Sequence, residues 1–107
     1  MNQEEIRDYC LSKLGVTEGL PFNDTALVFK VAGKMFALLD LSVDNRGLTL
    51  KCDPGIALEL REQYIEVTPA YHFNKKHWNT INLDGTVPDK EVFSWIDHSY
   101  ELITGKH

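Results

Sequence analysis

The sequence predicts an α+β fold in the order α-β(3)-α-β(2)-α, with a mainly antiparallel five-stranded sheet that carries its helices on one face. Three observations predict this class. Short runs of alternating apolar residues are typical of strands, tight-turn sequences join several of them, and three longer segments repeat apolar residues at a helical spacing. A chain of 107 residues can bury one modest core, so we expect a single domain over residues 1–107.

The first predicted element is a helix over residues 3–14. Apolar residues recur at every fourth position along it: Ile6, Cys10 and Leu14. Gly15 follows in the usual place for a left-handed C-terminal cap. Residues 18–24 are dense in turn formers and predict a loop, in which we expect Leu20 and Phe22 to tuck under the fold.

Three strands are predicted next, over residues 27–31, 35–41 and 48–52. Ala32-Gly33-Lys34 forms a tight hairpin between the first two, and residues 43–47 form the second hairpin loop with Arg46 at its tip. The middle strand is apolar on both faces, which favours a central position in the sheet.

The second predicted helix covers residues 54–63, because Asp53 can cap its free amides and a proline fits its first position. Its buried stripe is expected to consist of Ile56, Ala57, Leu60 and Tyr64. Residues 65–71 form a short extended segment and residues 78–83 alternate as a strand. The last helix opens at Pro88. Its apolar stripe contains Val92, Phe93, Ile96, Tyr100 and Ile103.

The alternation of the strands also predicts which side chains face away from the helices. These are Val28, Lys30, Thr49, Lys51, Trp78, Thr80 and Asn82. Such a face is half polar, basic and aromatic. A partner protein, a second subunit or nucleic acid would find contacts on it.

Charge is sorted along the chain. The stretches 25–39, 45–52 and 67–83 contain no acidic residue. They hold six basic residues: Lys30, Lys34, Arg46, Lys51, Lys75 and Lys76. These stretches coincide with predicted strands, so we expect a basic sheet side and an acidic helix side. The net charge of −5 and the pI near 5.2 argue against strong non-specific nucleic-acid binding by the whole molecule.

Composition narrows the remaining classes. No apolar run approaches the roughly 20 residues that span a bilayer, and the acidic N-terminus lacks an apolar signal core, so we expect a cytoplasmic protein without a membrane partner. Cys10 and Cys52 suit a reducing compartment. Two buried thiols are the simpler interpretation, and a disulfide between them is the alternative.

We expect no metal, no cofactor and no catalytic activity. His72 and His77 do not have the spacing of a helical ligand pair, and neither cysteine lies near them in sequence. Both thiols fall on inward positions, and nothing supplies an oxyanion hole. Asp97 and His98 are adjacent on a helix and therefore point apart. No glycine-rich phosphate loop is present.

Residues 71–80 alternate cations with aromatic and amide side chains. The candidate contacts on this run are His72, Asn74, Lys75, Lys76, His77, Trp78 and Asn79. Its lysines would neutralise phosphates, its aromatic side chains would stack on bases, and its amides would read base edges. Lys30, Arg46 and Lys51 would add phosphate contacts from the sheet. The alternative is structural: the histidines bond loop carbonyls, the tryptophan covers a sheet edge, and the lysines are only solvated.

Four segments, residues 29–36, 48–54, 71–80 and 96–100, together resemble the MmcQ/YjbR family, and the resemblance covers nearly the whole chain. It implies a small bacterial DNA-binding protein with a double-wing arrangement and a secretion-chaperone-like α/β domain. It points to the 71–80 run with Lys51 beside it, and brings no established catalytic set. Two functions stay open: a non-enzymatic DNA-binding protein, or a protein-interaction or dimerisation module that uses the sheet face.

Overall fold

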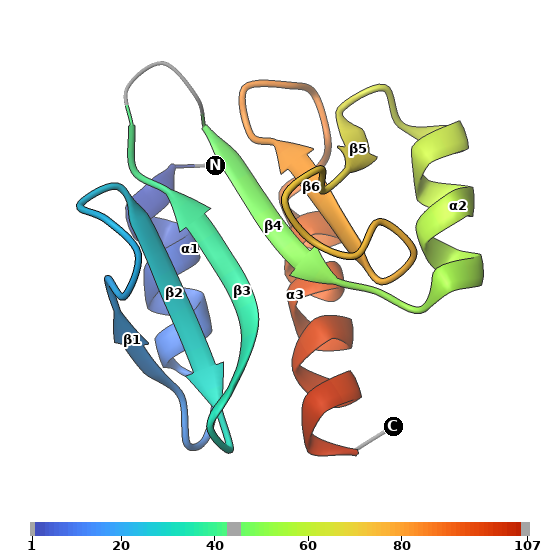
Figure 1. Cartoon of the computed structure of the whole chain (residues 1–107). Helices are drawn as coiled ribbons and strands as arrows, with labels where there is room; N and C mark the ends of the chain where they lie inside the picture. The colour runs from blue at the N-terminus through green and yellow to red at the C-terminus, as the bar shows by residue number, and fades with distance from the viewer. Residues whose placement is uncertain (1, 43–45, 106–107) are drawn as a thin grey trace.

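The computed structural model describes residues 2–42 and 46–105. Within that range the chain forms three helices and one antiparallel sheet of six strands, in the order β1-β2-β3-β4-β6-β5 (Figure 1). The elements are α1 (Gln3–Leu11), β1 (Thr17–Gly19), β2 (Ala26–Val31), β3 (Lys34–Asp40), β4 (Gly47–Lys51), α2 (Pro54–Gln63), β5 (Val67–Pro69), β6 (Trp78–Asn82) and α3 (Asp89–Thr104).

The predicted class and the order of the long elements are confirmed, but the strand number is wrong by one. The additional strand is β1, which pairs with β2 from Thr17 opposite Lys30 to Gly19 opposite Val28. Three exposed residues are too few to show an alternating pattern, so this strand resembled a loop in the sequence. Most of the second predicted hairpin loop, residues 43–45, lies outside the described residues.

Helices α1 and α3 cover one face of the sheet and lie behind it in Figure 1. The core between these layers contains Ile6, Cys10, Leu27, Phe29, Val31, Phe36, Ala37, Leu39, Leu48, Leu50, Val67, Ile81, Val92 and Ile96. Helix α2 lies at the far edge beside β5, where it buries Ala57. In the described part of the chain, no helix combines the length and the apolar character needed to cross a membrane.

Four expected core residues are instead exposed. Leu14 is 81% exposed because α1 ends at Leu11, and the Tyr100 hydroxyl donates to the Leu14 carbonyl rather than packing on its side chain. Leu20 (49% exposed) and Phe22 (66%) do not tuck under the fold, since their loop crosses the opposite side of the sheet. Ile56 is 40% exposed, so α2 buries a narrower stripe than predicted.

We call the side of the sheet that faces away from α1 and α3 the open face. The strand register places one row of side chains across all six strands: Gly19, Val28, Leu38, Thr49, Thr80 and Thr68. Lys51 lies opposite Trp78 in a neighbouring row of the same face. Lys30 is two positions after Val28 on β2, so the two side chains share that face. This register confirms the predicted set of outward side chains.

A β-bulge interrupts the middle of the sheet. Phe29 pairs with Ala37 while Lys30 pairs with Met35, so Phe36 is the extra residue and its ring turns into the core. At the bulge the buried Ser99 of α3 stands between β3 and β4. Its hydroxyl donates to the Phe36 carbonyl (2.5 Å) and accepts from the Lys51 amide (3.0 Å). Ser99 therefore supplies hydrogen bonds at the position where the β3–β4 ladder is open.

The turn between β6 and α3 is held by the carboxylate of Glu66. Its Oε2 accepts from the amide (2.9 Å) and the hydroxyl (3.1 Å) of Thr86. Gly85 leaves the space for this carboxylate, because a Cβ at that position would lie 2.1 Å from Glu66 Cγ. The pKa of the Glu66 carboxyl is lowered, mainly by the hydrogen bond that the Thr86 amide donates to it.

We expect this turn to make stability sensitive to acid. A carboxyl whose folded-state pKa lies below its unfolded value stabilises the fold above the unfolded pKa, near 4.5, and loses that contribution as the pH falls through the folded value. Urea unfolding measured between pH 7 and pH 3 should therefore show a smaller loss of stability on acidification for Glu66→Gln than for the natural protein. Glu59→Gln, which removes the same charge from the exposed side of α2, is the control. Equal pH dependence of Glu66→Gln and the natural protein would contradict this account.

Candidate functional site

A hollow between α2 and the loop 71–77 gathers three basic residues. Its volume is about 420 Å³, and it is lined by Pro54, Leu58, Arg61, Lys75 and Lys76. We call it the basic hollow. The three α2 residues share one helix face, because positions separated by four and by three residues lie above one another. Among the described residues that line it, three are basic and none is acidic.

Arg61 is held in place by the protein. Its Nε donates to Asn79 Oδ1 (2.7 Å), and its Nη2 donates to the carbonyl of Lys75. Asn79 is 2% exposed, and its Nδ2 donates to the Ala57 carbonyl (3.3 Å). The outer N–H groups of the guanidinium are still available to an anion. Buried Asn79 therefore orients a permanent cation at the hollow.

The loop that carries Lys75 and Lys76 is held by its own hydrogen bonds. Asn74 Oδ1 accepts from the Lys76 amide (3.0 Å) and the Asn74 carbonyl from the His77 amide (3.0 Å), which makes Asn74 a turn residue. The His77 carbonyl accepts from the Cys52 amide (2.7 Å). These bonds fix the backbone of the loop and leave the two lysine side chains exposed.

Two aromatic residues of the predicted run have distinct surroundings. The half-buried Trp78 packs against Phe73 with ring centroids 5.3 Å apart, so part of its surface is used within the protein. Tyr71 is 68% exposed, and the Lys75 ammonium lies 5.0 Å from its ring centroid. Tyr71 therefore offers the more accessible ring for stacking beside the basic hollow.

Asn79 and Arg46 do not line the basic hollow, and the burial of Asn79 contradicts its predicted contact with a base. Asn79 points to the helix side of the sheet and is buried, so it cannot reach a base edge. Arg46 precedes β4 and pairs with Asp84 at 3.2 Å. Lys51 is the last residue of β4. At 3.4 Å per residue, its backbone lies about 17 Å from that of Arg46, so Arg46 is at the opposite end of the strand.

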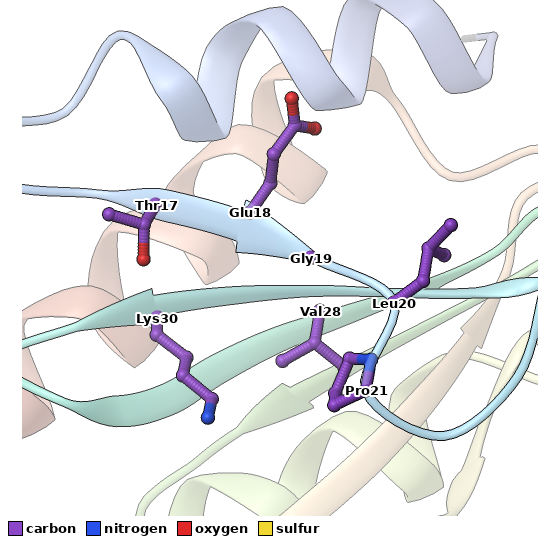
Figure 2. A pocket seen from close by; sticks show the side chains of 7 residues that line it. All are labelled: Thr17, Glu18, Gly19, Leu20, Pro21, Val28 and Lys30. Carbon is purple, nitrogen blue, oxygen red and sulfur yellow. The ribbon is translucent and has the colours of Figure 1, made fainter.

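Lys30 lies on the open face but apart from the basic hollow. Figure 2 shows it beside a second hollow of about 340 Å³, formed by β1, β2 and Leu20–Pro21. Lys30 is on β2 and Lys51 is on β4. Strand β3 lies between these two strands, which are therefore about 10 Å apart. In the same view the Glu18 side chain points the other way, toward α1, where it binds Arg7 (2.6 Å). The carboxylate of Glu18, which lies beside Lys30 across the β1–β2 pair, therefore points away from the open face.

His72 lines a third hollow, of about 380 Å³, in the middle of the open face. The loop 20–25 contributes Phe22 and Asn23 to this space and the loop 71–77 contributes His72 and Phe73. Asp40 of β3 also lines it, which is one acidic exception to the predicted basic sheet side. His72 is therefore accessible, but it faces this hollow rather than the lysines.

The basic residues fall into two groups by their partners. Arg7, Lys13 and Arg46 pair with Glu18, Asp97 and Asp84 respectively. Over the described residues, seven basic residues form no ion pair: Lys30, Lys34, Lys51, Arg61, Lys75, Lys76 and Lys90. The acidic residues Glu4, Glu5 and Asp8 lie on α1, behind the sheet. Five of these seven basic residues, all but Lys34 and Lys90, lie on the open face or at the basic hollow.

Both cysteines are free and buried, as the simpler interpretation predicted. Desolvation raises the pKa of Cys10 to about 12 and that of Cys52 to about 11, so both stay protonated thiols at neutral pH. Within residues 2–42 and 46–105, no three His, Cys, Asp or Glu side chains gather where they could hold one metal ion.

The adjacent Asp97 and His98 point apart, as expected from a helix. Asp97 accepts from the Tyr9 hydroxyl of α1 (2.7 Å), whereas His98 Nε2 accepts from the Asp53 amide at the start of α2 (3.2 Å). These two residues therefore join α3 to the other two helices, and they do not form an acid–histidine pair.

Sequence reasoning missed Arg61, the best-positioned cation of the site. The stretches chosen for their lack of acids exclude α2, where glutamates surround this arginine in sequence. A usable signal was present in the spacing of Pro54, Leu58 and Arg61, which places an exposed leucine and an arginine on one helix face.

The chain is similar to proteins whose names give no activity. The YjbR family model matches residues 11–102. The uncharacterized protein YjbR of Escherichia coli (strain K12) is 36% identical over 102 residues, which cover 94% of this chain and 86% of that protein. The uncharacterized protein YyaQ of Bacillus subtilis (strain 168) is 29% identical over 116 aligned positions, with 95% and 98% covered.

Solved structures show the same fold. The crystal structure of the Deinococcus radiodurans protein DR2400 is similar with a TM-score of 0.90 and 41% identity, over 96% of this chain and 78% of that one. The crystal structure of a Pseudomonas syringae protein gives a TM-score of 0.82 and 30% identity, over 95% and 98%.

Proposed function

The chain belongs to the YjbR family, and from that premise and from its unpaired basic residues we propose that it is a non-enzymatic DNA-binding protein of the cytoplasm. One observation carries the proposal: Arg61, Lys75 and Lys76 meet at the basic hollow without any acidic residue in its lining. Lys51 ends the strand next to Trp78 and extends the same positive region. Two free cysteines suit the reducing cytoplasm.

These groups suit the backbone of DNA better than its bases. Lysine and arginine contribute affinity by neutralising phosphates, and this contribution is independent of sequence. Tyr71 is the one exposed ring next to them among the described aromatic residues of the 71–80 run, so it would stack on a base or sugar. With Asn79 buried and Asn74 occupied by its turn, little is left on this run to read base edges. The proposal is therefore of weak binding with low sequence preference.

We expect a fluorescently labelled duplex to bind in an anisotropy titration at about 50 mM salt, with an affinity that falls at least about tenfold in Lys75→Ala/Lys76→Ala. Arg46→Ala/Lys90→Ala is the matched control, because it removes the same charge at positions away from the basic hollow. Equal loss in the two double variants would mean that only net charge matters. Undiminished binding by Lys75→Ala/Lys76→Ala would overturn the proposal.

A second candidate function is a protein-interaction or dimerisation module that uses the open face. Phe22, 66% exposed, stands at the 380 Å³ hollow there with Leu38 and Phe73. Exposed rings over a concave surface are typical of contact sites between proteins. The DNA titration and a sedimentation experiment together separate the candidates. This second function predicts that the duplex does not bind and that the sedimentation of the protein depends on its concentration.

A further inference from the structure

The basic hollow combines its charge with an apolar surface, and DNA backbone contacts would leave that surface unused. Leu58 is 57% exposed on α2, so an apolar side chain is available to a ligand in the hollow. It lines the hollow together with Pro54, one helical turn before it. The apolar wall and the cations therefore face one common space.

We propose that the basic hollow binds a small organic anion, a carboxylate or phosphate monoester that carries an apolar body. The anionic group would contact Arg61, Lys75 and Lys76, and the apolar body would cover Leu58 and Pro54. The hollow's volume of about 420 Å³ lies within the roughly 300–1,000 Å³ of small-molecule sites.

The anion-binding groups are already oriented before any ligand arrives. Arg61 is fixed by Asn79 Oδ1 at 2.7 Å and by the carbonyl of Lys75, so its planar guanidinium does not have to be ordered on binding. The turn at Asn74 fixes the backbone of Lys76. A planar cation held next to two exposed lysines suits a carboxylate or phosphate, which accepts two parallel hydrogen bonds from arginine.

This inference does not rest on DNA binding, although the two ligands would share Lys75 and Lys76. The apolar wall distinguishes them. Leu58→Asn should weaken the organic anion and leave the affinity for DNA unchanged, because a phosphate backbone makes no use of a leucine. Since Leu58 is already exposed, this substitution leaves the core intact.

The test is a titration of ¹⁵N-labelled protein with octanoate and with phenyl phosphate, followed by amide chemical shifts. We expect saturable shifts at residues 54–61 and 74–76 for at least one of them. Acetate, which lacks the apolar body, and octyltrimethylammonium, which has the opposite charge, should give no saturable shifts there. The stronger of octanoate and phenyl phosphate identifies the carboxylate or the phosphate ester as the preferred group.

Variants make the outcome decisive. Leu58→Asn and, separately, Lys75→Gln/Lys76→Gln should each weaken the bound probe about tenfold or more. Ile65→Asn and Lys90→Gln are the controls, since Ile65 is 93% exposed outside the hollow and Lys90 lies on α3. The proposal is overturned if neither anion shifts these residues, if acetate or octyltrimethylammonium binds there equally well, or if the Leu58 and Ile65 variants behave alike.

Discussion

Replacing Ser99 by alanine is expected to remove about 2–6 kcal/mol from the free energy of unfolding. Its hydroxyl is fully buried and bonds both the Phe36 carbonyl and the Lys51 amide, at 2.5 and 3.0 Å. Alanine leaves these two backbone groups in the interior without partners, and each such group costs about 1–3 kcal/mol. The loss should be seen as a lower urea midpoint with an unchanged slope.

Ser94→Ala is the control for this prediction, because Ser94 lies on the same helix with an exposed side chain and should change stability by no more than about 0.5 kcal/mol. Hydrogen exchange adds a local measurement. The amide of Lys51 should exchange faster in Ser99→Ala than in Ser94→Ala, because its acceptor is gone. If the two serine variants unfold at the same urea concentration, the hydrogen bonds of Ser99 at the bulge do not stabilise the fold.

The second large effect is expected for Asn79→Leu. The leucine has a similar size but offers no partner to the Ala57 carbonyl or to Arg61 Nε, so we expect a loss of about 1–3 kcal/mol in stability. It also releases Arg61 from its fixed orientation. Binding of an anion at the basic hollow should therefore weaken even though Asn79 itself does not line that hollow.

A double-mutant cycle with Arg61→Leu measures whether this mechanism is correct. If Asn79 acts on the hollow through Arg61, the losses of anion affinity in the two single variants should not add in the double variant. A coupling energy smaller than about 0.3–0.5 kcal/mol would show that the two residues act independently and would contradict the positioning role of Asn79.

Much of the fold could be predicted from local patterns. Asp53 and Pro54 marked the start of α2 correctly, and the Ala32-Gly33 turn has the two positive φ angles, 52° and 77°, that a two-residue hairpin requires. These features depend on neighbouring residues only. Strand β1 was missed because its identity depends on pairing with β2 rather than on a pattern of its own.

The site was harder to predict because it depends on contacts between distant segments. Asn79 was counted among the accessible amides of the 71–80 run, although the predicted alternation of Trp78, Thr80 and Asn82 already turned it inward; it faces α2, where Ala57 and Arg61 bind it. Arg46 had the right charge but lies at the other end of β4 and is paired with Asp84. Arg61 became part of the site only because α2 packs beside the loop that carries Lys75. None of these placements follows from composition.

Phosphate binding at the basic hollow can be measured through the salt dependence of DNA affinity. Four basic contacts, from Lys51, Arg61, Lys75 and Lys76, predict a plot of log K against log salt concentration with a slope of about −3.6, at −0.9 for each phosphate. The slope should become shallower by about 2 in Lys75→Gln/Lys76→Gln and stay unchanged in Arg46→Gln/Lys90→Gln. A slope that is the same in both double variants would contradict the account.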